Sequence, residues 1–149
     1  MINSLKQYFA GEGQFADLGV ASVENDYSWK IPKKMFDGRL INYPGSNFEA
    51  NVALKKDLSR RWANEPGDRE KITKWIISNW GGIHGNKKST INFYCREAQD
   101  ANPKTPLKGI ASFSKVLGVK DPDTYAIYDA RVAVSLNAVQ FLSEEKSGL

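Results

Sequence analysis

The pattern of apolar residues changes near residue 46. Before this point no helical or strand period is sustained, whereas after it apolar residues recur at spacings of three and four, the period of helices that bury one face. We expect five helices, in residues 46–65, 68–80, 89–98, 107–117 and 129–141. The pattern therefore predicts a mainly α fold.

The expected helices carry start and stop signals. Ser46 or Asn47 suits the N-cap of the first helix, and Glu49 suits its first turn. Ser89 is expected to cap the third helix. The two glycines that follow Trp80 are typical of a helix end, so the second helix should stop there.

Residues 1–45 contain early glycines and a Pro-Gly turn signal, which are typical of loops. We expect an irregular arm that packs on the helical body, residues 46–149, through Tyr27, Trp29 and Phe36. A chain of 149 residues suits one domain and is long enough to bury a core without covalent staples. The prediction is one compact helical domain over residues 1–149.

Composition narrows the function classes. The single cysteine, Cys95, excludes an internal disulfide and any metal site built on several thiolates. The first residues lack the apolar stretch of a signal peptide, and no segment approaches the ~20 apolar residues that span a bilayer. We therefore expect a cytoplasmic protein. The net charge of +4 permits a polyanionic partner, but an ordinary, slightly basic protein has the same balance.

Lys115 and Asp129 are the candidates for chemistry. Lys115 lies on an expected helix among Phe113, Val116 and Leu117, and partial burial of an amine favours its neutral, nucleophilic form. Asp129 opens the last expected helix, where a carboxylate stays ionised and fixed in direction. Taken singly, Asp129 is more simply a helix cap and Lys115 a solvated side chain. The pair together suggests an amine nucleophile with an acidic partner.

Residues 106–137 resemble the helix-hairpin-helix DNA glycosylases, and most of all the 8-oxoguanine DNA glycosylase-fold proteins of bacteria. Ser114-Lys115 matches the Ser/Thr-Lys step of that superfamily, and the stretch IYDARV, residues 127–132, matches its aspartate step. Trp80 and the Gly-Gly-Ile that follows it fit the same body more loosely. Two hairpin glycines of the family are replaced here by Ala111 and Phe113, and we expect no counterpart of the extra N-terminal sheet domain that the larger glycosylases carry.

The resemblance implies a base-excision reaction on double-stranded DNA with a modified or damaged base. The nucleotide is turned out of the duplex, Lys115 attacks the deoxyribose C1′, the base leaves and a Schiff base forms. Elimination can then nick the strand. Asp129 would orient the lysine and stabilise the cationic sugar. This chemistry needs no metal and no organic cofactor.

Further residues are assigned by the same interpretation. The expected DNA contacts are Lys87, Lys88, Lys108, Arg131 and His84, with Lys104 on the same phosphate track. The expected walls of the base pocket are Tyr128, Trp80 and Phe113. A run of lysines is more often a solvated face, and Trp80 is more often core than a stacking wall.

Two other functions remain open at this point. The chain could be a non-catalytic helical DNA-binding module, or a small helical interaction protein in which Lys115 and Asp129 merely pair or cap. The replaced hairpin glycines favour these two, and the joint presence of the lysine and aspartate steps favours the glycosylase. Repair, phage and phage-defence contexts are all compatible with glycosylase chemistry.

Overall fold

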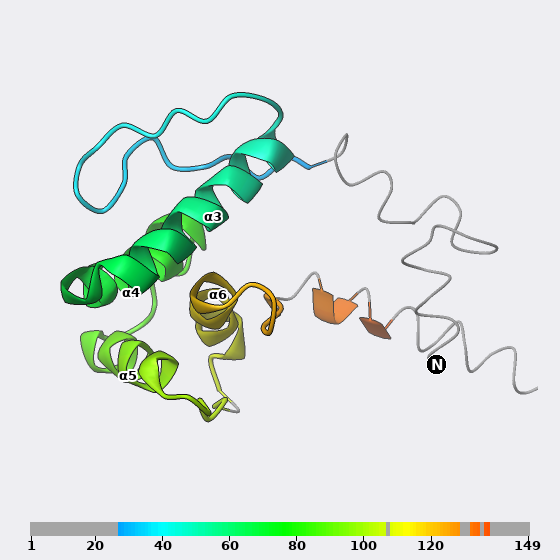
Figure 1. Ribbon diagram of the computed structural model, residues 1–149. Coiled ribbons are helices and arrows are strands. Elements are labelled where there is room, and N and C mark those ends of the chain that lie inside the picture. The colour runs from blue at the N-terminus through cyan, green and yellow to red at the C-terminus, as the bar shows by residue number, and fades with distance from the viewer. Residues whose placement is uncertain (1–26, 107, 129–131, 135, 138–149) are drawn as a thin grey trace, which may run out of the picture.

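The computed structural model describes residues 27–106, 108–128, 132–134 and 136–137 (Figure 1). The described part is mainly α, as predicted, and its only extended pairing is an isolated bridge between Lys34 and Leu40. The elements are α3 (Asn47–Asn64), the 3₁₀ turn η3 (Pro66–Asp68), α4 (Arg69–Trp75), the π-helical turn η4 (Ile76–Trp80), α5 (Lys88–Gln99) and α6 (Ile110–Lys120). The helix-hairpin-helix arrangement itself stays a prediction.

The start of α3 is the capping box that its sequence indicates. The Ser46 hydroxyl accepts the Glu49 N–H at 3.3 Å, and the Glu49 carboxylate accepts the Ser46 N–H at 2.7 Å. These two bonds satisfy backbone donors that a helix start leaves free. The first expected helix is therefore confirmed together with its cap.

The start of α5 differs from the expectation. The helix begins at Lys88, because the Lys87 carbonyl accepts the N–H groups of Thr90 and Ile91 at 3.0 and 3.1 Å. Ser89 lies inside the first turn, so its assignment as the cap was wrong. Downstream, α6 continues to Lys120, past the expected end at Leu117.

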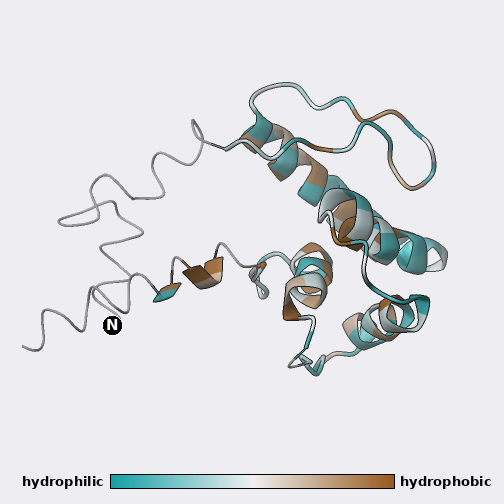
Figure 2. Ribbon diagram, turned by 180° about the vertical axis from the view of Figure 1, so that it is seen from behind, coloured by the Kyte–Doolittle hydropathy of each residue, from teal (hydrophilic) through white to brown (hydrophobic). Residues whose placement is uncertain are grey.

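The core lies between the facing sides of α3, α4, α5 and α6 (Figure 2). The apolar residues that recur at helical spacing in the second and third expected helices, residues 68–80 and 89–98, are buried. Cys95 is one of them, and its burial raises the pKa of its thiol. The fully buried side chains of the core include Leu54, Leu58, Ile72, Ile76, Ile77, Phe113, Val116 and Val119. Among the described residues, no helix is both long and apolar enough to cross a membrane.

The described part of the arm, residues 27–45, packs on this body through its aromatic side chains. Tyr27 meets Phe48 edge-on at 5.8 Å between ring centroids, and the Arg61 guanidinium lies 4.4 Å from the Phe36 ring centroid. The Trp29 indole donates to the Trp80 carbonyl at 3.0 Å. Aromatic side chains thus hold residues 27–45 in place without a sheet.

The last expected helix is only partly described. Residues 132–134 and 136–137 are helical, and the large apolar side chains of Val132, Val134 and Leu136 are exposed, with Val134 at 67%. Asp129 and Arg131 lie outside the described residues. Their assigned roles, and the single-domain division of the chain, stay predictions.

Candidate functional site

Lys115 lies on α6, where its side chain crosses the backbone that follows η4. A Cβ built on Gly81 would lie 3.0 Å from Lys115 Cδ, so the lysine stem passes directly over this glycine. The Lys115 ammonium donates to the Ala111 carbonyl, one turn back on the same helix, at 3.1 Å. The side chain is half-buried. Lys115 is therefore held against protein over most of its length.

The π-helical turn η4 sets the position of Gly81. The Gly81 N–H donates to the Ile76 carbonyl, five residues back, at 2.7 Å. Single π turns within helices are frequent at functional sites. A Cβ at Gly81 would also lie within 3 Å of the carbonyl oxygens of Ile76 and Ile77, so only glycine fits beneath the lysine without a shift.

A network of hydrogen bonds around the buried Asn51 amide also holds η4 in place. The Asn51 amide donates to the carbonyls of Trp29 and Asn47 at 2.8 and 2.7 Å, and its oxygen accepts the Trp80 indole N–H at 2.7 Å. Together with the bond from Trp29 to the Trp80 carbonyl, this closes a ring between the arm, α3 and η4. Satisfied buried networks of this kind rigidify the elements they join.

Ser114, the neighbour of Lys115, binds the main chain of Tyr128. Its hydroxyl accepts the Tyr128 N–H at 2.9 Å and lies 3.0 Å from the Tyr128 carbonyl, to which it can donate. Ser114 is 7% exposed. The residue that follows Tyr128 in the chain is Asp129. Tyr128, which precedes the predicted acid Asp129, is thus hydrogen-bonded to the helical turn that carries the predicted nucleophile, Lys115.

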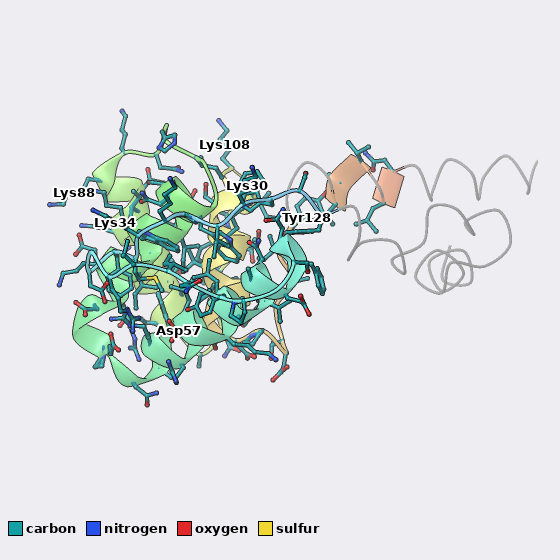
Figure 3. All side chains as sticks on the ribbon, turned by 90° about the horizontal axis from the view of Figure 1, so that it is seen from above. Lys30, Lys34, Asp57, Lys88, Lys108 and Tyr128 are labelled. Carbon is teal, nitrogen blue, oxygen red and sulfur yellow. The ribbon has the colours of Figure 1, made fainter. Side chains whose placement is uncertain are left out.

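The structure places the remaining predicted site residues as follows. Lys87, Lys88, Lys108 and His84 are exposed, and Figure 3 shows Lys88 and Lys108 on one side of the molecule. Tyr128 is 37% exposed. Trp80 and Phe113 are 7% and 0% exposed and belong to the core cluster, so their role as pocket walls stays a prediction.

Sequence reasoning assigned Trp29 to arm packing alone. In the structure its ring also covers Gly82, the residue after Gly81, because a Cβ on Gly82 would lie 3.7 Å from Trp29 Cη2. Trp29 is half-buried and therefore keeps an accessible edge. No local pattern signals this contact, since more than 50 residues separate the two positions.

Replacing Ser114 with alanine is expected to cost about 1–3 kcal/mol of unfolding free energy, because the main chain of Tyr128 loses its partner. It should also lower any activity that depends on Lys115. Denaturant unfolding measures the first effect. Ser89→Ala is the control, since Ser89 is an exposed serine near a helix start; an equal loss in both variants would contradict the role assigned to the Ser114 bond.

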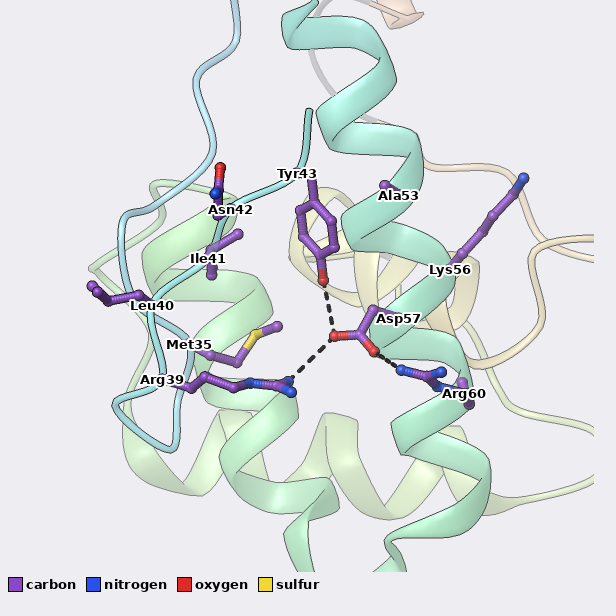
Figure 4. Close-up of a pocket in the computed structure, with 10 residues that line it drawn as sticks. All are labelled: Met35, Arg39, Leu40, Ile41, Asn42, Tyr43, Ala53, Lys56, Asp57 and Arg60. Carbon is purple, nitrogen blue, oxygen red and sulfur yellow. Dashed lines mark hydrogen bonds and ion pairs between the residues drawn. The ribbon is translucent and has the colours of Figure 1, made fainter. Parts of the chain in front are cut away.

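A pocket of about 580 Å³, away from Lys115, opens between residues 35–43 of the arm and α3 (Figure 4). The Asp57 carboxylate, 9% exposed, accepts the Tyr43 hydroxyl at 2.9 Å and pairs with Arg39 at 3.4 Å and with Arg60. Lys56 points away from this cluster in Figure 4. The contacts of Asp57 with Arg39 and Tyr43 join the arm to α3. They explain how residues 39–43 are held in place.

Partial burial and the bond to Asp57 raise the pKa of Tyr43 from 10.0 to about 12. The neutral phenol therefore stabilises the fold fully below pH 10, and this stabilisation is lost as the pH rises through about 12. We expect the unfolding free energy of the wild type to fall over this window, and that of Tyr43→Phe to fall less. Denaturant unfolding at stepped alkaline pH measures this, and parallel curves would contradict the assignment.

The described residues contain no cluster of three or more histidine, cysteine or acidic side chains that could hold a metal ion. Searches of protein-family models, curated proteins and solved structures give no match to the chain.

Proposed function

We propose that this protein is a DNA glycosylase with lyase activity, in which Lys115 attacks C1′ of a modified nucleotide. The observation that carries the proposal is the bond between Ser114 and the main chain of Tyr128. It joins Ser114, in the lysine step, to Tyr128, the residue that precedes Asp129 in the aspartate step, and these two residues are 14 positions apart in the sequence. A nucleophile and its acidic partner must be held close in this way for covalent catalysis.

The chemistry proceeds through an amine. The neutral Lys115 amine forms a bond to C1′, the N-glycosidic bond breaks with its electron pair on the base, and the amine proton passes to the departing base. Opening of the sugar ring then gives the Schiff base. Loss of a proton from C2′ and cleavage of the C3′–O bond nick the strand. Asp129 is assigned to orient the amine and to stabilise the cationic sugar.

The fixed stem of Lys115 supports this role. Packing over Gly81 restricts the long side chain, so little rotamer freedom remains to be lost when the amine meets a substrate. The bond from the ammonium to the Ala111 carbonyl must break before attack. That carbonyl also accepts from the helix backbone in a regular turn, so releasing the lysine does not leave it unsatisfied.

The aromatic residues with accessible surface near Lys115 are the natural contacts for an extruded base. Tyr128 is fixed through its main chain to Ser114, and Trp29 covers the glycine next to Gly81. Aromatic faces bind bases by stacking. Both residues therefore suit the recognition of a base better than the buried Trp80 and Phe113 do.

A non-catalytic DNA-binding module is the second candidate. The observation that favours it is that Lys115 already has a packing partner, Gly81, and a hydrogen-bond partner, the Ala111 carbonyl. These contacts alone would give the lysine a structural role. In that case the exposed lysines would dock DNA without any reaction.

The experiment that separates the two candidates is a base-release assay. The protein is incubated with duplexes that each carry one oxidised, alkylated or deaminated base, and the strands are then cleaved at abasic sites with alkali. The glycosylase proposal expects release from at least one lesion and none from the undamaged duplex. Binding to all the duplexes with no release from any would favour the docking module.

A further inference from the structure

Two neighbouring hollows on the surface share the same two lysines. A hollow of about 660 Å³ between α4 and α5 is lined in part by Lys71, Lys74, His84 and Lys88. A second hollow, of about 390 Å³ between the arm and α4, is lined in part by Lys34 and again by Lys71 and Lys74. We call Lys34, Lys71, Lys74 and Lys88 the basic strip. Its members come from the arm, α4 and α5 and therefore form one continuous surface.

The charges of the basic strip are largely uncompensated. Lys71 pairs with Asp68 at 2.7 Å, but no ion pair within the described residues involves Lys34, Lys74 or Lys88. Among the described residues, the acid that lines the larger hollow is Glu70. The Asn92 amide, in the orientation that satisfies its neighbours, donates to Glu70 at 2.9 Å. The four lysines of the strip thus outnumber the two acids beside them, Asp68 and Glu70, and leave an excess of positive charge.

The backbone beneath the strip is held in place. The Trp75 indole donates to the Lys34 carbonyl at 3.0 Å. This bond joins the arm to α4 beside the smaller hollow, which both residues line. On the other side, Asn86 donates to the Ser112 hydroxyl at 3.0 Å and ties the loop that carries His84 to α6, one turn before Lys115. The strip and the helix of Lys115 are therefore joined through one short loop.

We propose that the basic strip binds the sugar–phosphate backbone of duplex DNA, and that it extends the footprint of the Lys115 site over the arm and α4. The inference rests on the proposed function for the choice of DNA as the polyanion. A row of lysines spread over three elements matches a repeating anion better than one small anion, which would need convergent donors. Figure 3 shows Lys34 and Lys88 on the same side of the molecule as Lys108, with Asp57 on the opposite side.

The test compares two double variants that lose equal charge. Lys34→Ala with Lys74→Ala removes two members of the strip, and Lys56→Ala with Arg60→Ala removes two exposed cations beside Asp57. Binding to an undamaged fluorescent duplex is measured by anisotropy over a range of salt concentrations. Each phosphate contact contributes about 0.9 to the slope of log K against log salt. The strip variant should lose about two units of slope, and about 10-fold in affinity per lysine near 0.1 M salt; the control should lose less than one unit.

Equal slopes for both variants and the wild type would overturn the proposal, as would an equal loss in both doubles. Displacement of the duplex by polyglutamate as readily as by unlabelled DNA would overturn the choice of DNA. Should the alanine double unfold, Lys34→Gln with Lys74→Gln removes the charges and keeps the stems. The undamaged duplex requires no catalysis, so failure of base release with an intact strip effect would count against the glycosylase alone.

Discussion

Replacing Lys115 with glutamine will abolish base release and strand nicking while leaving duplex binding nearly unchanged. Glutamine keeps much of the stem that packs over Gly81, but its amide cannot form a Schiff base. We expect the rate to fall by about 1,000-fold or more, which corresponds to about 4 kcal/mol of lost transition-state stabilisation. Single-turnover assays on a lesion duplex measure the rate, and anisotropy measures the binding.

Lys120→Gln is the matched control. Lys120 is on the same helix, is also partly buried, and its ammonium also donates to a backbone carbonyl, that of Asp100, at 2.7 Å. This control should keep full activity. If Lys115→Gln keeps base release, or if Lys115→Gln and Lys120→Gln lose the same fraction of the rate, Lys115 is not the nucleophile.

Replacing Gly109 with alanine is expected to produce the largest loss of stability. Gly109 precedes α6 with a φ of +79°, a conformation that costs other residues about 1–2 kcal/mol. Its added Cβ would also strike the hydroxyl of the buried Tyr94, whose ring lies 5.3 Å from that of Phe113. With an overpacking cost of about 1–3 kcal/mol, the total is about 2–5 kcal/mol.

Thermal unfolding measures this effect as a fall of about 4–20 °C in the midpoint for a chain of this size. Gly67→Ala is the control, because Gly67 has an ordinary φ and a Cβ there meets nothing within 4 Å. Similar midpoints for Gly109→Ala and the wild type would contradict this prediction. They would show that the start of α6 tolerates a side chain and that Tyr94 moves aside with little loss of unfolding free energy.

The helical body could be predicted because its signals are local. The spacing of Ile72, Trp75, Ile76 and Trp80 indicates a buried face within one segment, and all four are buried. The capping box of α3 is likewise contained in four consecutive residues. Such patterns follow directly from the geometry of one helix.

The arrangement around Lys115 could not be predicted in the same way. The contact that brings Gly81 under the lysine depends on packing between η4 and α6, and the Ser114 bond joins residues 14 positions apart. The basic strip combines Lys34 with Lys74, which only the fold of the arm onto α4 brings together. Contacts between distant segments leave no period in the sequence, so only the structure reveals them.

The most direct test of the central claim is borohydride trapping on a duplex with a single abasic site, which makes the outcome independent of the base. Borohydride reduces a Schiff base to a stable bond, so an amine that attacks C1′ stays attached to the DNA. We expect one covalent complex, with the adduct mapped by mass spectrometry to Lys115. No covalent complex under conditions in which the duplex is bound, or an adduct on a different residue, would contradict it.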